Sequence, residues 1–203
     1  LILSLQQIHG LLQETPSVVK SGKIVINHIT CNTDGSRFLL LVRNFPEPGK
    51  ERGTAAITAN ADGSDPYVLS DYAMTSHYHW RDEQHLLTYA KHAEGNQLYL
   101  LCDKSREYEI IDRDFFKSDG HCSYAPDRKQ IMYDSYPENN YRHLFVYNVP
   151  GHKGCKLASL YSVPVTDGEI RCDLHPRWHP NGKQVSFDST HENQRHIYLA
   201  RLA

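Results

Sequence analysis

The sequence lacks the features that mark several large protein classes. Its 203 residues carry 22 basic and 24 acidic side chains, for a formal net charge of −2, and contain no basic run. Phosphate binding requires a positive electrostatic footprint, so nucleic acid is disfavoured as a partner. No stretch approaches the roughly 20 apolar residues that span a bilayer. With 39% hydrophobic residues the chain is also too apolar to be disordered, so we expect a globular protein that binds neither nucleic acid nor membrane.

Cysteine is scarce and irregularly placed. There are five cysteines and no C-x-x-C pair, which argues against both a disulfide framework and a cysteine-rich zinc site. The opening segment LILSLQQIHGLLQE has no basic region and is interrupted by polar residues, so it is a poor signal peptide. We therefore expect free thiols and a cytoplasmic location, in a chain that was processed at its start or is a piece of a longer protein.

Common enzyme motifs are missing as well. The sequence has no G-x-S-x-G nucleophile elbow, no phosphate loop and no dinucleotide fingerprint. It is unusually rich in two residue types instead, with 13 histidines and 13 tyrosines.

Four segments align when each is started at a histidine, namely His28, His77, His121 and His175, which are 44 to 54 residues apart. In each segment an aromatic residue or a cysteine follows after three residues, and an acidic or amide turn residue follows after six. Two alternating apolar runs come next, so each unit reads as short strands joined by tight turns. Outer fourth strands are expected at 66–70, 108–112 and 155–163.

Three or four antiparallel strands that repeat every ~40 to 50 residues are typical of β-propeller blades. The predicted fold is all-β, a propeller of four-stranded antiparallel blades over 28–76, 77–120, 121–174 and 175–203. Because propellers close with ~4 to 8 blades, we expect these four to be the C-terminal part of a larger ring.

Residues 1–27 precede the first repeat. Apolar residues fall on one helical face over Ser4–Glu14, and Ser4 is a good N-cap, so a short connector helix is expected there. The segment SVVKSGKIVI (17–26) is expected to be the outer strand of a preceding blade.

The repeated histidines have more than one interpretation. The first strand of each propeller blade lines the central channel, so four imidazoles at one register would surround one axis. They would suit a divalent cation such as Zn, Mn, Fe or Ni, or supply a general base near neutral pH. A purely structural role within each blade is an equal alternative. Cys122 and Cys172 lie near the expected axis and could add ligands, although buried inert thiols are the commoner state.

Further polar residues surround the fourth histidine. Asp173 precedes His175 by two residues, on the same face of an extended strand, where it would join the imidazole as a ligand, orient it or cap a turn. Arg171 and Arg177 share that face and would hold a carboxylate bidentately, with Arg177 equally readable as a solvated charge. His79 is a second candidate base.

Two further sets recur between repeats. Trp80, Tyr124 and Trp178 stand at a fixed offset from the histidines, which favours packing between blades over stacking on sugars. Asp134 and Asp188 are aligned in parallel polar loops, where aspartates usually make turn or inter-blade hydrogen bonds.

Two segments carry a resemblance to a known family. GHCSYAPDRKQIMYD and DLHPRWHPNGKQVSFDSTHENQRHIYLARL resemble the TolB-like propeller repeat, and most of all oligogalacturonate lyase, the polysaccharide lyase family 22 propeller. The similarity runs from about His28 to the end of the chain and is sharpest over 119–201. Many propellers without enzymatic activity share the generic repeat, so the histidines are the more discriminating part.

The resemblance implies a seven-bladed propeller with a divalent metal, typically manganese, on histidines of successive inner strands. The implied reaction is β-elimination on a short uronate oligosaccharide, as in pectin degradation. The metal would bind the C6 carboxylate and acidify the C5 proton, and a histidine would remove that proton.

The resemblance matches His121 and His175 to metal ligands, His77 to the base and His28 to a histidine at the channel mouth. One departure is that Ile170 and Asp173 stand where the family has a glutamine and a histidine, which allows a changed coordination shell, another metal or another uronate. Taken with the residues above, the candidate set is metal ligands His121, His175 and Asp173, catalytic residues His77, His28 and Arg177, and substrate-binding residues His79 and Arg171.

Three functions compete at this point. The leading hypothesis is a metal-dependent lyase acting on uronate-containing oligosaccharides. The second is a non-catalytic propeller that binds a protein or glycan, as TolB-like domains do. The third, the propeller of a prolyl-oligopeptidase-type serine peptidase, requires a following α/β-hydrolase domain.

Overall fold

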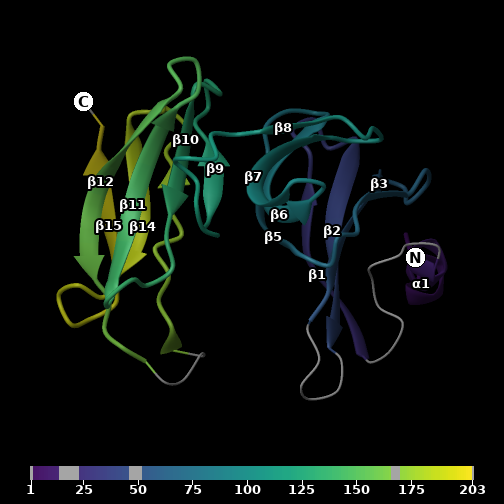
Figure 1. Ribbon diagram of the computed structural model, residues 1–203, viewed down its shortest axis with the longest axis horizontal. Helices are drawn as coiled ribbons and strands as arrows, with labels where there is room; N and C mark the ends of the chain where they lie inside the picture. The colour runs from purple at the N-terminus through teal and green to yellow at the C-terminus, as the bar shows by residue number, and fades with distance from the viewer. Residues whose placement is uncertain (1, 14–22, 46–51, 166–169, 203) are drawn as a thin grey trace. The chain divides into compact units, whose positions relative to one another are not determined.

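The computed structural model describes residues 2–13, 23–45, 52–165 and 170–202 (Figure 1). The chain divides into two compact units. Unit 1 comprises Leu1–Ser76 with Trp80–Arg113, and unit 2 comprises His77–His79 with Asp114–Ala203. No helix of the described residues is long and apolar enough to cross a membrane.

The described strands form four antiparallel sheets, and within each sheet strands that follow one another in sequence are neighbours. The first two sheets are formed by β1 (Lys23–Cys31), β2 (Arg37–Phe45), β3 (Thr54–Asn60) and β4 (Tyr67–Ser70), and by β5 (Thr75–Trp80), β6 (His85–His92), β7 (Gly95–Cys102) and β8 (Tyr108–Ile110). The other two are formed by β9 (Cys122–Tyr124), β10 (Gln130–Asp134), β11 (Tyr141–Asn148) and β12 (Lys153–Tyr161), and by β13 (Arg177–Trp178), β14 (Gln184–Ser189) and β15 (His196–Arg201).

Each sheet contains one of the four sequence repeats, which confirms the predicted all-β propeller with antiparallel blades. The expected outer strands are present as β4, β8 and β12. The fourth sheet has three strands within the described residues.

The turn between the first two strands of each sheet is held by the same kind of hydrogen bond. A side-chain oxygen accepts the backbone N–H of the residue two positions further on, at 2.9 to 3.0 Å, and the accepting residues are Asp34, Asp127 and Asn181. In the second repeat the accepting residue is Asp82, which binds the Gln84 N–H at 2.9 Å, and not the expected Glu83. Aspartate and asparagine suit this position because their short side chains reach the backbone of their own turn.

The predicted N-terminal helix is confirmed as α1 (Leu5–Gln13). The Ser4 hydroxyl accepts the Gln7 N–H at 3.2 Å, and the Gln7 side chain accepts the Ser4 N–H at 2.8 Å, so the two residues form a reciprocal capping box. Ile8 and Leu12 are buried in the core of the first sheet. The apolar face of α1 thus covers strands of unit 1.

The segment expected to be an outer strand of a preceding blade (17–26) lies partly outside the described residues. Its last four residues belong to β1, where Lys23 pairs with Phe45 of β2. The run KIVINHITC forms one strand with a β-bulge between Asn27 and Thr30, so these residues join the sheet of the first repeat rather than another blade.

A tryptophan bond links the two sheets within each unit. In unit 1 the Trp80 indole N–H donates to the Thr30 carbonyl at 3.2 Å. In unit 2 the Trp178 indole donates to the Ser123 carbonyl, also at 3.2 Å. Each tryptophan stands three residues after the histidine of its own repeat. Each accepting carbonyl belongs to the residue two positions after the histidine of the preceding repeat. These positions therefore pack between blades, as the fixed offset predicted.

The third repeat has a tyrosine at this position, and its backbone bonds to a histidine within unit 2. The backbone N–H of Tyr124 donates to Nδ1 of His79 at 3.3 Å. This bond requires an unprotonated Nδ1. Burial lowers the pKa of His79, which favours the neutral ring.

Replacement of Trp178 by phenylalanine should destabilise the protein by about 1–2 kcal/mol, because the Ser123 carbonyl loses its donor and the smaller ring fills less space. Chemical denaturation of both proteins measures this difference. Leu157→Ala, at an exposed position of β12, is the control and should cost under about 0.5 kcal/mol. Equal stability of Trp178→Phe and the parent protein would show that the indole does not couple the sheets.

His79 should make folding stability depend on pH. Its pKa is lower in the folded protein than the ~6.5 of an unfolded chain, so the unfolded state binds more protons as the pH falls. Stability should therefore decrease below about pH 6.5 and level off once the folded ring is also protonated. His79→Asn keeps an acceptor and does not titrate, so it should lose less stability between about pH 7.5 and about pH 5.5. Parallel pH dependences of the two denaturation midpoints would contradict this assignment.

Candidate metal centre

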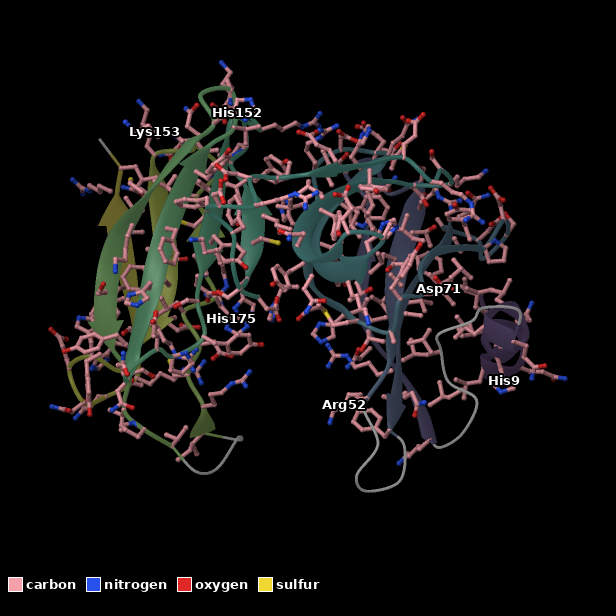
Figure 2. All side chains as sticks on the ribbon, in the orientation of Figure 1. His9, Arg52, Asp71, His152, Lys153 and His175 are labelled. Atoms are coloured by element: carbon pink, nitrogen blue, oxygen red, sulfur yellow. The ribbon has the colours of Figure 1, made fainter. Side chains whose placement is uncertain are left out.

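Three of the four repeat histidines lie in a row within unit 2. The ring centroids of His77 and His121 are 3.9 Å apart, and those of His121 and His175 are 3.7 Å apart. His77 belongs to β5, His121 directly precedes β9, and His175 (labelled in Figure 2) precedes β13 by two residues. The shared register of the repeats thus brings three imidazoles into contact.

Carboxylates orient two of these rings. Nδ1 of His77 lies 3.0 Å from Oδ1 of Asp119, and Nδ1 of His121 lies 2.9 Å from Oδ2 of Asp134. A carboxylate only accepts hydrogen bonds, so Nδ1 carries the proton in both rings. In the neutral ring the lone pair is then on Nε2, which is the atom that can bind a metal or take up a proton.

His121, Asp173 and His175 form a group of possible metal ligands. Their ligand atoms all lie within 4.8 Å of one another, and the group combines a buried carboxylate with a half-buried and an exposed imidazole. Two imidazole nitrogens and a carboxylate oxygen suit borderline divalent cations. Burial and the neighbouring His121 lower the pKa of His175, which favours the neutral form that binds metal. The donor set therefore fits a divalent cation.

Asp173 also binds two arginines. Its Oδ1 lies 2.7 Å from Nη1 of Arg142, and its Oδ2 lies 2.7 Å from Nη2 of Arg171. The Asp173 and Arg142 side chains are each 4% exposed, whereas Arg171 is 48% exposed. A cation at Asp173 would compete with these guanidinium groups, and Arg171 is the one with access to solvent.

Tyr136 borders the centre and was missed by the sequence analysis. The ring centroid of Tyr136 is 5.9 Å from the ring centroid of His77. The guanidinium carbon of Arg171 lies 5.6 Å from the same Tyr136 centroid. Burial and then Asp119 raise the pKa of Tyr136. The aligned position of the fourth repeat is Thr190, so the repeat pattern contained no signal for this residue.

Asp119 was also missed, although a signal was available. It precedes His121 by two residues, just as Asp173 precedes His175. The same Asp-x-His spacing occurs in both repeats. Asp134 was considered only as a turn or inter-blade hydrogen-bonding residue.

The remaining candidates belong to unit 1 or have other contacts. His28 is an exposed residue of β1 in unit 1, at a β-bulge and with φ of 55°. The Arg177 guanidinium lies 3.3 Å from Oδ2 of Asp188, and 56% of its side chain is exposed. His79 accepts the Tyr124 N–H. Their catalytic and substrate-binding roles remain predictions.

The two cysteines near the centre have the properties of inert thiols. Cys122 and Cys172 are both buried, and burial raises the pKa of each thiol. A protonated thiol is a poor metal ligand.

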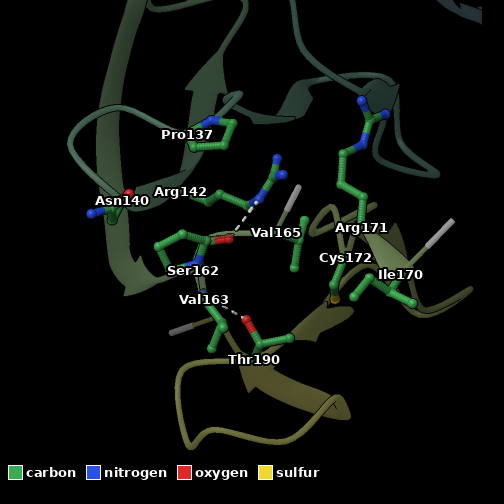
Figure 3. Close-up of a pocket in the computed structure, with 11 residues that line it drawn as sticks. Pro137, Asn140, Arg142, Ser162, Val163, Val165, Ile170, Arg171, Cys172 and Thr190 are labelled. Carbon is green, nitrogen blue, oxygen red and sulfur yellow. Dashed lines mark hydrogen bonds between the residues drawn. The ribbon is translucent and has the colours of Figure 1, made fainter. Parts of the chain in front are cut away.

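A pocket of about 260 Å³ opens beside the arginines that hold Asp173 (Figure 3). Arg142 lines it and donates from Nε to the Ser162 hydroxyl at 3.2 Å. The other lining residues include the aliphatic side chains Val163, Val165 and Ile170. The pocket thus combines two guanidinium groups with apolar walls.

The chain matches no protein-family model and no curated protein. It does match solved structures. An oligogalacturonate lyase in complex with manganese matches with a TM-score of 0.67 and 18% identity, over 88% of this chain and 49% of the lyase. TolB from Acinetobacter baumannii matches at 0.59 and 13% identity, over 88% and 55% of the two chains. An acylaminoacyl peptidase from Pyrococcus horikoshii matches at 0.57 and 8% identity, over 88% and 31%.

These likenesses show a shared fold. The chain has the β-propeller fold of oligogalacturonate lyase and TolB, as the repeats and the quoted segments predicted. It spans about half the length of each of these two proteins. At such low identity the match extends to the propeller architecture and not to an activity.

Proposed function

We propose that the protein is a metal-dependent lyase that cleaves uronate-containing oligosaccharides by β-elimination. The observation that carries the proposal is the contact of three imidazoles, two of them oriented by carboxylates, beside the buried Asp173. The structural likeness to an oligogalacturonate lyase bound to manganese supports it.

In this proposal His121 and His175 hold a divalent cation, Mn²⁺ by analogy with that structure, together with Asp173. When bound, such a cation neutralises a uronate carboxylate and so makes the proton on the adjacent carbon more acidic. Arg171 and the pocket beside it offer positive charge for the rest of an anionic sugar chain.

His77 is the proposed base. Asp119 holds its Nδ1–H, so Nε2 accepts the C5 proton and Asp119 stabilises the imidazolium that forms. The C5–H electron pair becomes the C4–C5 double bond, and the bond from C4 to the glycosidic oxygen breaks. That oxygen takes a proton from water, and the His77 imidazolium then returns its proton to the hydroxide that remains. A neutral imidazole beside a carboxylate is suited to this step near neutral pH.

One observation favours a second function. Both oxygens of Asp173 lie 2.7 Å from guanidinium nitrogens, which leaves its charge compensated by the protein itself. A centre that keeps both arginines would be a polar binding surface rather than a metal site. The alternative is therefore a propeller that binds a protein or glycan without catalysis, an idea that the likeness to TolB also supports.

The full-length protein, incubated with oligogalacturonides and Mn²⁺, should generate the ultraviolet absorbance of an unsaturated uronate. Chelation of the metal and His121→Ala should each abolish the signal. His77→Ala should lower kcat by about 10²–10⁴ while leaving metal binding intact, because it removes only the base.

His9→Ala, an exposed histidine of α1, is the control and should keep full activity. Metal binding without product from any of several uronates would reject the lyase. If elemental analysis and calorimetry detect no bound metal, the metal centre itself is wrong and the binding function takes its place.

Metal affinity also distinguishes whether Asp173 is a metal ligand or only the ion-pair partner of Arg142 and Arg171. Asp173→Asn should weaken Mn²⁺ binding at least about tenfold, since it removes the anionic donor. Arg171→Gln should strengthen Mn²⁺ binding, because it removes a competing cation from the same carboxylate. Isothermal titration calorimetry measures both changes. An unchanged affinity in the two variants would mean that Asp173 serves only the arginines.

A further inference from the structure

We propose that Asp134 is the positioning residue of this centre, which fixes both the tautomer of His121 and the backbone of His175. The inference rests on the proposed metal site, since it concerns two of its ligands. Asp134 itself was identified from the sequence only as a turn or inter-blade residue.

The Asp134 carboxylate receives three N–H groups. Oδ1 accepts the backbone N–H of His121 at 2.6 Å, and the imidazole Nδ1 of the same residue lies 3.0 Å from Oδ1 and 2.9 Å from Oδ2. Oδ2 also accepts the backbone N–H of His175 at 3.0 Å. The residue is only 1% exposed, so water does not weaken these bonds. One buried side chain thus binds two ligand residues that lie 54 positions apart in the sequence.

The backbone of Asp134 is itself held in place. It is the last residue of β10 and pairs with Leu144 of β11, and its N–H donates to the His121 carbonyl at 3.1 Å. His175 adopts a φ of 41°, a conformation that non-glycine residues rarely take. A hydrogen bond from the His175 N–H to a rigidly held carboxylate offsets part of this strain.

Only a carboxylate can accept all three donors. Asparagine at this position would have one acceptor oxygen, and its NH₂ group would face an N–H donor. With the amide oxygen at the Oδ1 position, both His121 donors keep their acceptor and the NH₂ group opposes the His175 N–H. With the amide oxygen at the Oδ2 position, the NH₂ group opposes the His121 backbone N–H and donates to Nδ1, so the ring proton moves to Nε2, which then no longer binds a metal. Asparagine therefore loses either the His175 backbone bond or the His121 tautomer. The aligned Asp188 has different partners, since its carboxylate pairs with Arg177 and Arg195. The function of Asp134 is therefore not a generic property of the repeat position.

The experiment compares the parent protein with Asp134→Asn by two measurements. Long-range ¹H–¹⁵N NMR of the metal-free proteins reports the tautomer of His121, and calorimetry reports Mn²⁺ affinity. We expect an Nδ1–H tautomer in the parent. In Asp134→Asn we expect either an Nε2–H tautomer of His121 or a shifted His175 amide resonance in ¹H–¹⁵N spectra, with metal affinity reduced about 10–100-fold. Asp134→Glu retains a carboxylate and should recover the Nδ1–H tautomer.

Asp103→Asn is the matched control. Asp103 is another buried carboxylate, 2.5 Å from Arg37 in unit 1, so its loss should destabilise the fold without changing the His121 tautomer or metal affinity. An Nε2–H tautomer in the parent protein would overturn the proposal, even if Asp134→Asn does not fold. An unchanged His121 tautomer together with an unchanged His175 amide resonance in Asp134→Asn would also overturn it. A tautomer change in a protein that binds no metal would support the role of Asp134 and reject the metal site.

Discussion

The candidate centre depends on the hydrogen bond between the Trp178 indole and the Ser123 carbonyl. Trp178 follows His175 by three residues and Ser123 follows His121 by two, so this bond sets the offset between the first strands of two sheets. With that offset fixed, the two imidazoles come into contact at 3.7 Å between centroids. This packing interaction lies within three residues of each histidine, and together with the bond from the His175 N–H to Asp134 it holds the two ligand residues side by side.

The two aspartates of the centre, Asp119 and Asp173, are balanced by different positive or proton-donating partners. The same Asp-x-His spacing places Asp119 beside the histidine of the preceding repeat, His77, and Asp173 beside His121. Asp119 is part exposed and pairs with its imidazole, whereas Asp173 is buried and requires positive partners. Two arginines meet this requirement. The two carboxylates therefore differ in burial and partners although their sequence patterns are alike.

The sequence predicted the parts of this protein that repeat. Strand alternation and the spacing of the histidines identified the blades, and the fixed offset of Trp80 and Trp178 identified their packing role. Tyr136 was beyond such reasoning because it lies in a loop whose counterpart in the next repeat differs. Asp134 resembles an ordinary turn aspartate in sequence, and its function depends on His175, which is distant in the chain. The repeat therefore indicates the blades and the three histidines that meet, whereas Tyr136 and the partners of Asp134 differ between repeats.

The number of donors at the centre links its geometry to its chemistry. His121, His175 and Asp173 offer three ligand atoms. Under the proposed function this number is fewer than Mn²⁺ takes up, which would leave positions for water and substrate oxygens. If Arg171 keeps its ion pair with Asp173, only the imidazoles of His121 and His175 remain as metal ligands, and two imidazoles bind a metal weakly. In the proposed lyase, the half-exposed Arg171 would leave Asp173 for an anionic sugar. An acidic substrate would then free Asp173 to bind the metal and would itself pair with the Arg171 guanidinium. Metal and substrate should therefore bind cooperatively.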